Sequence, residues 1–324
     1  MIMESLTNAT GTLLIERLGE KNCELIATPV DRKCAGRLRI TTDYPIPLIR
    51  EIFKESGAGW TCDEISRDID MMDSQLDVRL SVEAYFPDEV FTRCLRILDY
   101  GCGRGSSTLA LTRLFPNAEI VATDFVPAYL EVAKLRFAHY GKSISVYQTQ
   151  TSGDVEGRYD FVFLNAVYEH LLPDERRPVM HRLLAALKPG GTMIINQTPH
   201  RGFPIDAHTT NIPLINYLPR PIAHRLANAK SGQKDSWSQL LRIGIRGATV
   251  HEIMRHVSDI DPLAQLRKPI RVARSWAGIW YVAKRARVGS KLTRFALGSV
   301  GAVVGRLRLP LTPYLNIAVT RSTE

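Results

Sequence analysis

Short apolar runs alternate with amphipathic stretches through the middle of the chain. An apolar run over residues 95–98 precedes a helix-forming stretch over 106–115, and a second run covers 118–124. Two more apolar runs lie at 159–165 and 192–195. Short buried strands that alternate with helices are typical of a parallel sheet covered by helices. The pattern therefore predicts an α/β fold.

Glycines mark the junction between the first of these strands and its helix. Residues 94–107 read Cys-Leu-Arg-Ile-Leu-Asp-Tyr-Gly-Cys-Gly-Arg-Gly-Ser-Ser, so Asp99 is followed by Gly101, Gly103 and Gly105. Glycine is needed where the backbone takes φ > 0 or where a ligand lies against it. A strand, a glycine loop and a helix N-terminus form a nucleotide-type pocket at the carboxyl end of a parallel sheet. Three glycines spaced by two argue against an ordinary tight turn.

The glycine spacing differs from that of dinucleotide-binding proteins. Their fingerprint has glycines at the first, third and sixth positions, whereas here the sixth position is Ser106 and the third glycine comes one residue early, at Gly105. The acidic Asp99 suits a ligand with an amine better than one with a pyrophosphate, because it would repel a phosphate. These departures argue against NAD.

The Asp-x-Gly-x-Gly-x-Gly segment resembles motif I of the class I S-adenosylmethionine (SAM) methyltransferases, where it cradles the methionine part of the cofactor. The resemblance implies that Asp99, Gly101, Cys102, Gly103 and Gly105 contact SAM. Cys102 is interpreted as a small residue that fits the loop rather than as a nucleophile.

The resemblance continues in order along the chain. Asp124 ends the second strand, 19 residues after Gly105, where an acidic residue accepts both ribose hydroxyls. The same residue is compatible with an N-cap for the helix that begins near Pro127. Phe125, directly after the second strand, and Asn165, at the end of the fourth strand, complete the predicted cofactor contacts. The similarity spans about residues 95–200 and implies a Rossmann-like seven-stranded sheet with helices on both faces.

The chain on either side of this core is divided as follows. Residues 1–90 are expected to form an N-terminal accessory region, in which 64–77 is an exposed acidic helix and connector. Residues 91–261 form the core, with a substrate cap at about 199–240. A basic helical arm over 262–308 and a closing antiparallel edge strand within 309–324 complete the chain.

A polar, proline-broken segment follows the fifth strand, at residues 196–209. It should lie at the carboxyl end of that strand, over the methyl donor, where α/β proteins place substrate residues. It resembles a segment found in methyltransferases of glycan and lipid-linked pathways. The candidate catalytic residues in and near it are His208, then His170, with Asp206 orienting a histidine and His200 as a further candidate.

Two other residues near these candidates are given supporting roles. Glu169 is interpreted as fixing the loop or the substrate, and Tyr85 is expected to pack in the core. No metal-dependent carboxylate set is recognised, so no metal is expected. A sulfonium methyl is already activated, so the enzyme must align the acceptor, exclude water and remove the acceptor's proton.

Composition fits a cytoplasmic enzyme. The chain has 324 residues, 45% of them hydrophobic, and five cysteines with no CxxC pair, which argues against a disulfide framework or a zinc site. No secretory signal pattern begins the sequence, and no apolar run reaches 18 residues.

Positive charge is concentrated at the end of the chain. Residues 262–324 carry 12 basic and one acidic side chain (net +11), whereas residues 1–261 carry 30 and 32 (net −2). A helix over 270–287 would place Trp276 and Trp280 on an apolar stripe that includes Val272. Basic helices with tryptophans suit the anionic inner face of a membrane. Nucleic acid is a competing partner, and a lid or dimer face that packs the tryptophans inward is a third interpretation.

Three functions are therefore compared. The favoured one is O-methylation of a sugar, glycolipid or other amphiphilic small molecule, with a histidine general base. The second is RNA methylation with the basic arm, which is weakened because Asn165-Ala166-Val167-Tyr168 stands where a base-methylating enzyme would show an Asn-Pro-Pro-Tyr-like motif. The third is an NAD-dependent oxidoreductase or a catalytically inactive SAM-binding scaffold.

Overall fold

The computed structural model describes residues 2–32, 35–69, 71–149 and 157–323. Contacts within the chain divide it into two compact units. The first contains residues 1–75, 102–113 and 120–152, and the second contains 76–101, 114–119 and 153–324. The chain passes between the units inside the glycine loop, at residues 101 and 102. The boundaries of these units thus differ from the predicted domain boundaries, and the predicted domains stay a prediction.

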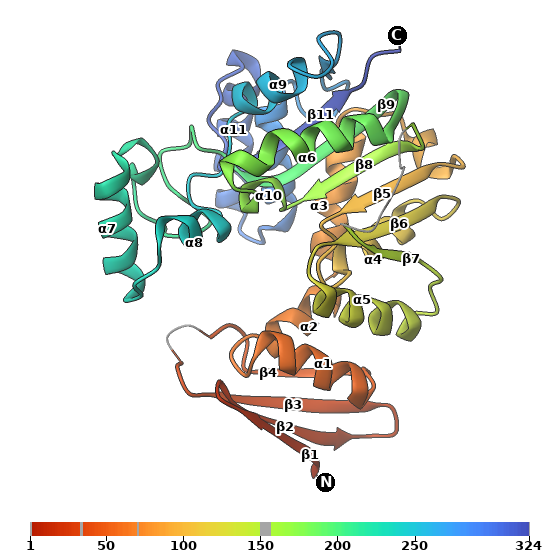
Figure 1. The fold of residues 1–324 in the computed structure, drawn as a ribbon, viewed down its shortest axis with the longest axis vertical. Helices are drawn as coiled ribbons and strands as arrows, with labels where there is room; N and C mark the ends of the chain where they lie inside the picture. Colours follow the sequence, from red (N-terminus) through yellow and green to blue (C-terminus); the bar gives the residue numbers. More distant parts are fainter. Residues whose placement is uncertain (1, 33–34, 70, 150–156, 324) are drawn as a thin grey trace. The chain divides into compact units, whose positions relative to one another are not determined.

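The N-terminal part of the first unit is an antiparallel sheet covered by helices (Figure 1). Side chains along the second and third strands alternate between buried and exposed, so one face forms a core with Leu48 and Ile52 of the first helix. The strands run in the order of the chain, and the elements are β1 (Ile2–Asn8), β2 (Gly11–Leu18), β3 (Asn22–Pro29), β4 (Arg39–Thr42), α1 (Ile46–Ser56) and α2 (Thr61–Ile69).

A seven-stranded, mostly parallel sheet carries the predicted core and confirms the α/β fold. The strand order is β10-β11-β9-β8-β5-β6-β7, in which β5, β8 and β9 run parallel, β6 and β7 run parallel, and β11 is antiparallel to β9. The strands are β5 (Arg96–Tyr100), β6 (Glu119–Asp124), β7 (Ser145–Gln148), β8 (Tyr159–Asn165), β9 (Leu187–Pro199), β10 (Gln265–Leu266) and β11 (Tyr314–Thr320).

Helices flank this sheet. In the second unit α6 contacts β8, β9 and α9, and α10 contacts β11, while in the first unit α5 contacts β7. The flanking elements are α3 (Met71–Glu83), η1 (Asp88–Thr92), α4 (Ser106–Leu114), α5 (Pro127–His139), η2 (Tyr168–His170), α6 (Pro173–Ala186), α9 (Val250–Ser258) and α10 (Trp276–Arg287).

The predicted cap contains a small helical lobe. Its elements are η3 (Ile215–Tyr217), α7 (Arg220–Ser231) and α8 (Trp237–Arg242), which lie together in Figure 1. Ile215, Ala223 and Leu240 are buried in a core of their own. The segment 196–209 was predicted to form no element, which is wrong for residues 196–199, because they continue strand β9 and pair with β11. Residues 200–209 form neither a helix nor a strand, as predicted, because prolines and polar side chains interrupt them.

The closing strand was predicted at the edge of the sheet, and this detail is wrong. β11 pairs with β9 on one side and with the two-residue strand β10 on the other, through Gln265–Thr320 and Leu266–Val319. A strand of two residues has no periodicity to recognise in a sequence, which is why the outer partner was missed.

The basic arm forms a helical hairpin of α10 and α11 (Lys291–Leu307) in the second unit. The predicted helix over 270–287 begins only at Trp276, and Val272 lies outside it with φ of 70°. Trp276 and Trp280 are half-buried against the cluster of Ala277, Tyr281 and Val304. The tryptophans therefore pack inside the hairpin, in line with the third interpretation.

Two arginines of the arm are held by ion pairs of the second unit. Both terminal nitrogens of Arg271 donate to the Asp88 carboxylate, Nη2 at 2.5 Å and Nη1 at 3.1 Å. Arg287 Nη2 lies 2.8 Å from Asp77 Oδ2. Part of the positive charge at the end of the chain is thus structural. No helix within the described residues is long and apolar enough to cross a membrane.

The prediction of an exposed acidic helix and connector over residues 64–77 is wrong for Glu64, Ile65 and Ser66, which are buried, and the side chains of residues 68–75 lie outside the described part of the structure. Glu64 is buried and pairs with Arg136, with Oε1 to Nη1 at 3.3 Å, because α2 packs inside the first unit. Tyr85 is buried, as expected, and its hydroxyl donates to the carbonyl of Asn316 at 2.8 Å. Burial raises the pKa of this phenol.

Candidate active site

In the second unit, polar side chains meet at the carboxyl ends of β5, β8 and β9. The chain leaves β5 on one side toward β6 and enters β8 on the other, which is the switch point where α/β sheets bind ligands. Asp99 is buried at the end of β5, and the Asn165 amide of β8 lies 3.5 Å from its Oδ1. Asn196 of β9 donates to the Asn165 oxygen at 3.4 Å and accepts from Ser81 at 3.0 Å.

The backbone beside these groups is constrained. Gly101 has φ of 74°, and a Cβ there would lie 2.6 Å from a methyl carbon of Val167, so only glycine fits. Ala166 has φ of 53°, a left-handed conformation that an alanine rarely adopts. Its N–H donates to the Asn196 carbonyl at 2.9 Å, which holds it there. Strain of this kind is common at ligand sites.

In the first unit, the rest of the glycine loop is tied to the end of β6. The N–H of Gly103 donates to Asp124 Oδ2 at 2.9 Å, and that of Cys102 donates to the Thr123 carbonyl at 2.9 Å. Asp124 Oδ1 accepts from the N–H of Val126 at 2.9 Å, just before α5. The carboxylate therefore organises both loops. Each of its oxygens has one backbone donor, which leaves capacity for ribose hydroxyls.

The surroundings of the loop leave room for a ligand. A Cβ on Gly103 would meet no atom of the described residues within 4 Å, although its φ of 55° still favours glycine. The ring of Phe125, next to Asp124, is 63% exposed. Gly105 also has a positive φ, of 93°, but a Cβ there would lie 2.7 Å from the Phe137 ring of α5, so packing on that helix requires this glycine. The cofactor contacts of this unit stay a prediction.

Arg136 of α5 supports the glycine loop, and its role was not recognised in the sequence. Its side chain is fully buried, donates to the Arg104 carbonyl, and contacts Ser106 Oγ at 3.1 Å and Glu64 Oε1 at 3.3 Å. The residue follows no motif, and only burial in the fold reveals its role.

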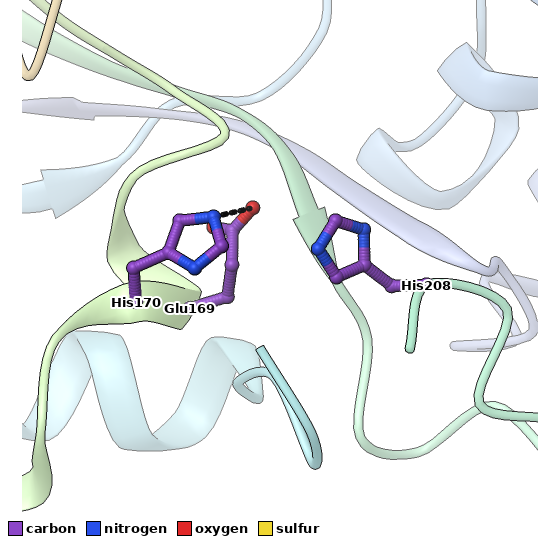
Figure 2. A group of neighbouring side chains, drawn as sticks. All are labelled: Glu169, His170 and His208. Carbon is purple, nitrogen blue, oxygen red and sulfur yellow. Dashed lines mark ion pairs between the residues drawn. The ribbon is translucent and has the colours of Figure 1, made fainter. Parts of the chain in front are cut away.

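Glu169, His170 and His208 form a cluster in the second unit (Figure 2). One ligand atom from each, a carboxylate oxygen or a ring nitrogen, lies within 4.8 Å of the others. Glu169 and His170 belong to η2, directly after β8, whereas His208 comes from the segment after β9. The fold thus brings together the two histidines that the sequence ranked first.

Glu169 is the buried member of the cluster. Its side chain has no exposed surface, and Oε2 accepts from the Thr198 hydroxyl at 3.0 Å. Oε1 has no hydrogen-bond partner among the described residues and lies 3.9 Å from His170 Nε2. Burial raises the pKa of this carboxyl to about 8. The carboxylate form therefore requires a cation or a donor beside it.

His170 is oriented by a backbone carbonyl. Its Nδ1 lies 2.6 Å from the Arg242 carbonyl oxygen, which can only accept, so Nδ1 carries the proton and Nε2 presents a lone pair. Arg242 in turn donates to the His170 carbonyl at 3.1 Å and pairs with Glu175. Desolvation lowers the pKa of His170, which favours the neutral ring.

His208 is held through its loop. Asp206 is buried and accepts from the N–H and the hydroxyl of Thr210 at 2.9 and 2.8 Å, so it shapes the loop. The Tyr314 hydroxyl donates to the Ala207 carbonyl at 3.1 Å, and the two rings of Tyr314 and His208 meet edge to face. Desolvation and the neighbouring His170 lower the pKa of His208.

His200, the remaining candidate, is not part of the cluster. It is buried, its Nδ1 lies 3.2 Å from the Thr312 carbonyl, and its ring packs edge to face on Trp276. Because its imidazole is buried and packed on the indole of Trp276, we interpret His200 as a structural residue. Gly244, which the sequence did not suggest, lines the cluster, because a Cβ there would lie 2.7 Å from the His208 ring.

Comparison with known proteins agrees with the fold and the glycine loop. The model of a methyltransferase domain family matches residues 97–191. Trans-aconitate 2-methyltransferase of Methylobacterium radiotolerans is 35% identical over 98 residues, which are 30% of this chain and 36% of that protein. Carboxy-S-adenosyl-L-methionine synthase of Vibrio parahaemolyticus is 30% identical over 107 residues, 31% of this chain and 43% of that protein.

A solved structure is similar over more of the chain. That of PKMT2 from Rickettsia typhi in complex with AdoHcy covers 78% of this chain and 54% of that one, with a TM-score of 0.44 and 13% identity. The curated relatives are matched over less than half of their length. Residues 97–191 are therefore similar to a methyltransferase domain, which supports S-adenosylmethionine as the cofactor.

Proposed function

We propose that the protein transfers the methyl group of SAM to a hydroxyl of a small amphiphilic acceptor, such as a sugar or glycolipid. One observation carries the proposal: the Glu169, His170 and His208 cluster follows the same strand ends, β8 and β9, that carry Asn165 and Asn196 beside Asp99. The methionine end of SAM would lie at Asp99 and Gly101. The acceptor would then meet its methyl group next to the cluster.

The reaction is an in-line displacement. The acceptor oxygen forms a bond to the methyl carbon while the carbon–sulfur bond breaks, and the electron pair stays on sulfur. A base must take the hydroxyl proton. We assign this role to His208 first and His170 second, because both rings are in the cluster, and Asp206 holds the loop of His208. His200 is left out of the proposal.

Apolar side chains on the cap favour an acceptor with an apolar part. Leu214, Tyr217 and Ile222 of the cap are each at least half exposed. Such side chains are suited to contact an alkyl chain or a terpenoid, whereas Asn165 and the cluster supply polar partners. The names of the two relatives refer to trans-aconitate and to carboxy-SAM. An acidic amphiphile therefore belongs in the set of acceptors to be tested.

The second half of the proposal is a peripheral position on an anionic membrane. The face that supports it is on α11 rather than on the tryptophans of α10, since Leu292 and Phe295 are 79% and 72% exposed and Val303 is 53% exposed. Basic residues flank these side chains at both ends of the helix, namely Lys291, Arg294, Arg306 and Arg308. Apolar and basic groups on one helix match the headgroup region of anionic lipid.

The donor is tested by calorimetric binding of SAM and S-adenosylhomocysteine, with NAD as the control. Micromolar binding of both sulfur compounds and none of NAD is expected. Binding of NAD alone would reject the methyltransferase and favour the oxidoreductase.

The acceptor and base are tested by transfer of labelled methyl from SAM to a panel of sugars, glycolipids, acidic amphiphiles and RNA. His208→Ala should lower kcat by roughly 10²–10⁴ with SAM binding unchanged, the range typical of a lost general base. His181→Ala, which removes an exposed histidine of α6, is the matched control. Methylation of RNA instead of small molecules would assign the basic arm to nucleic acid.

A further inference from the structure

We infer that Glu169, His170 and His208 form a binding site for one divalent transition-metal ion. Three ligand atoms of the right chemistry, one carboxylate oxygen and two imidazole nitrogens, already lie within 4.8 Å of one another (Figure 2). No metal was expected from the sequence, because the two histidines are 38 positions apart and only the fold brings them together. The inference rests on the proposed function for its catalytic consequence, but not for binding.

The buried carboxylate supports the site independently. Glu169 has no exposed surface, and its Oε1 points toward His170 Nε2 without a hydrogen-bond partner in the described residues. A buried, unpartnered carboxylate oxygen is costly unless a cation or a donor faces it. Thr198 occupies only the other oxygen, at 3.0 Å. Glu169 Oε1 is therefore positioned to coordinate a metal ion.

His170 has the orientation of a metal-binding histidine. Its Nδ1–H donates to the Arg242 carbonyl, so the free lone pair is on Nε2, the nitrogen that faces Glu169. Metal-bound histidines regularly donate their other ring N–H to a carbonyl or carboxylate, which fixes the ring. Arg242 itself is fixed by its ion pair with Glu175 and its bond to the His170 carbonyl.

The dimensions of the cluster require a modest adjustment. Ligand atoms about 2.1 Å from one ion lie roughly 3.0–3.4 Å apart in octahedral or tetrahedral geometry. The Glu169 and His170 atoms, at 3.9 Å, must therefore approach by about 0.5–0.9 Å. Atoms at the observed limit of 4.8 Å must approach by about 1.4–1.8 Å, which rotation of the exposed His208 side chain can supply.

The donor set indicates the class of ion. Two imidazoles and one carboxylate suit Zn²⁺, Mn²⁺, Fe²⁺ or Co²⁺, whereas Mg²⁺ and Ca²⁺ prefer oxygen ligands alone. Three protein ligands leave positions for an acceptor oxygen or for water. A hydroxyl bound there would lose its proton to water more readily. The ion would then take over the role that His208 has as base in the empty site.

The test uses the full chain, without a histidine tag, freed of metal by a chelator. Co²⁺ is titrated while its visible d–d absorption is recorded, and bound Zn²⁺ is counted by mass spectrometry after equilibration. The wild type should bind one ion per chain. His208→Ala and His170→Ala should each weaken Co²⁺ binding by more than tenfold, and Glu169→Gln should do the same. His181→Ala should bind as the wild type does.

Two results would overturn the inference: absence of stoichiometric binding by the wild type, or binding that the three cluster variants leave unchanged. Because His208 is exposed, His208→Ala is expected to fold even if Glu169→Gln does not. Binding of SAM is measured on the same samples. A wild type that binds SAM but no metal refutes the metal site alone, whereas a wild type that binds metal but no SAM refutes the proposed function alone.

Discussion

The backbone N–H of Gly103 donates to the side chain of Asp124 at 2.9 Å, so the glycine loop and the end of β6 are held by the same carboxylate. The other oxygen of Asp124 fixes Val126 at the start of α5. One side chain thereby sets the shape of two loops of the first unit, and any ribose contact is added to this function.

Replacement of Asp124 should therefore weaken SAM binding. A lost hydrogen bond to a charged group costs about 1.5–3 kcal/mol, which is roughly 10–100-fold in affinity for Asp124→Ala. Asp124→Asn should also bind poorly, because its amide would point a donor at one of two backbone N–H groups. Calorimetry measures both. Asp43→Ala, which removes an exposed carboxylate of the same unit, should change nothing. Unchanged affinity in Asp124→Ala would refute the ribose assignment.

Gly101 and Val167 provide a test of the close approach between β5 and the turn after β8. Gly101→Ala should lower the free energy of unfolding by about 2–4 kcal/mol, from the left-handed backbone and from overlap with Val167. Adding Val167→Ala should recover about 1 kcal/mol, since only the overlap is removed. Urea denaturation of the four proteins measures this coupling. Strictly additive effects would contradict the contact.

Ala166→Gly should stabilise the protein. The left-handed backbone at Ala166 is strained for alanine and free of strain for glycine, so a gain of about 0.5–1 kcal/mol in the free energy of unfolding is expected. The same exchange at Ala302, an exposed position inside α11, should instead cost about 1 kcal/mol. Opposite shifts of the denaturation midpoint would support the strained turn, and a loss in both variants would argue against it.

Arg136→Met should destabilise the first unit. It leaves Glu64 buried without its main partner and removes a donor from the Arg104 carbonyl, at a cost of about 3 kcal/mol in the free energy of unfolding. Adding Glu64→Gln should recover part of this loss. Arg113→Met, on the exposed face of α4, is the control. If both single variants unfold alike in thermal melts, the buried pair has no special role.

Phe295→Glu should reduce membrane binding. Burial of a phenylalanine contributes about 1.5–3 kcal/mol, so more than tenfold weaker sedimentation with anionic phospholipid vesicles is expected. Leu226→Glu on α7 is the matched control, and neutral vesicles should bind little wild type. Wild-type binding that is equally strong with Phe295→Glu would remove α11 from the proposal. Salt-sensitive binding of RNA, with none to vesicles, would favour the second function.

The sequence motifs predicted the structural features that depend on residues close together in the chain. Tyr159–Asn165 is a strand at the predicted residues, and the strand–glycine–helix order around Asp99 predicted the α/β core. Contacts that join distant segments could not be found in this way. Glu64 looked exposed because Arg136, its partner, is 72 positions away, and His200 was ranked beside His208 although its ring packs on Trp276.

The pairing of β9 with β11 has a consequence for the order of folding. The outer edge of β9 is covered by residues 314–320, more than a hundred positions later in the chain, and Tyr314 also holds the loop that carries His208. Contacts of such long sequence separation form slowly, because a large loop must close first. During synthesis the outer edge of β9 would remain unpaired until β11 has left the ribosome. Catalytic competence is thus expected only after β11 has been made and has paired with β9.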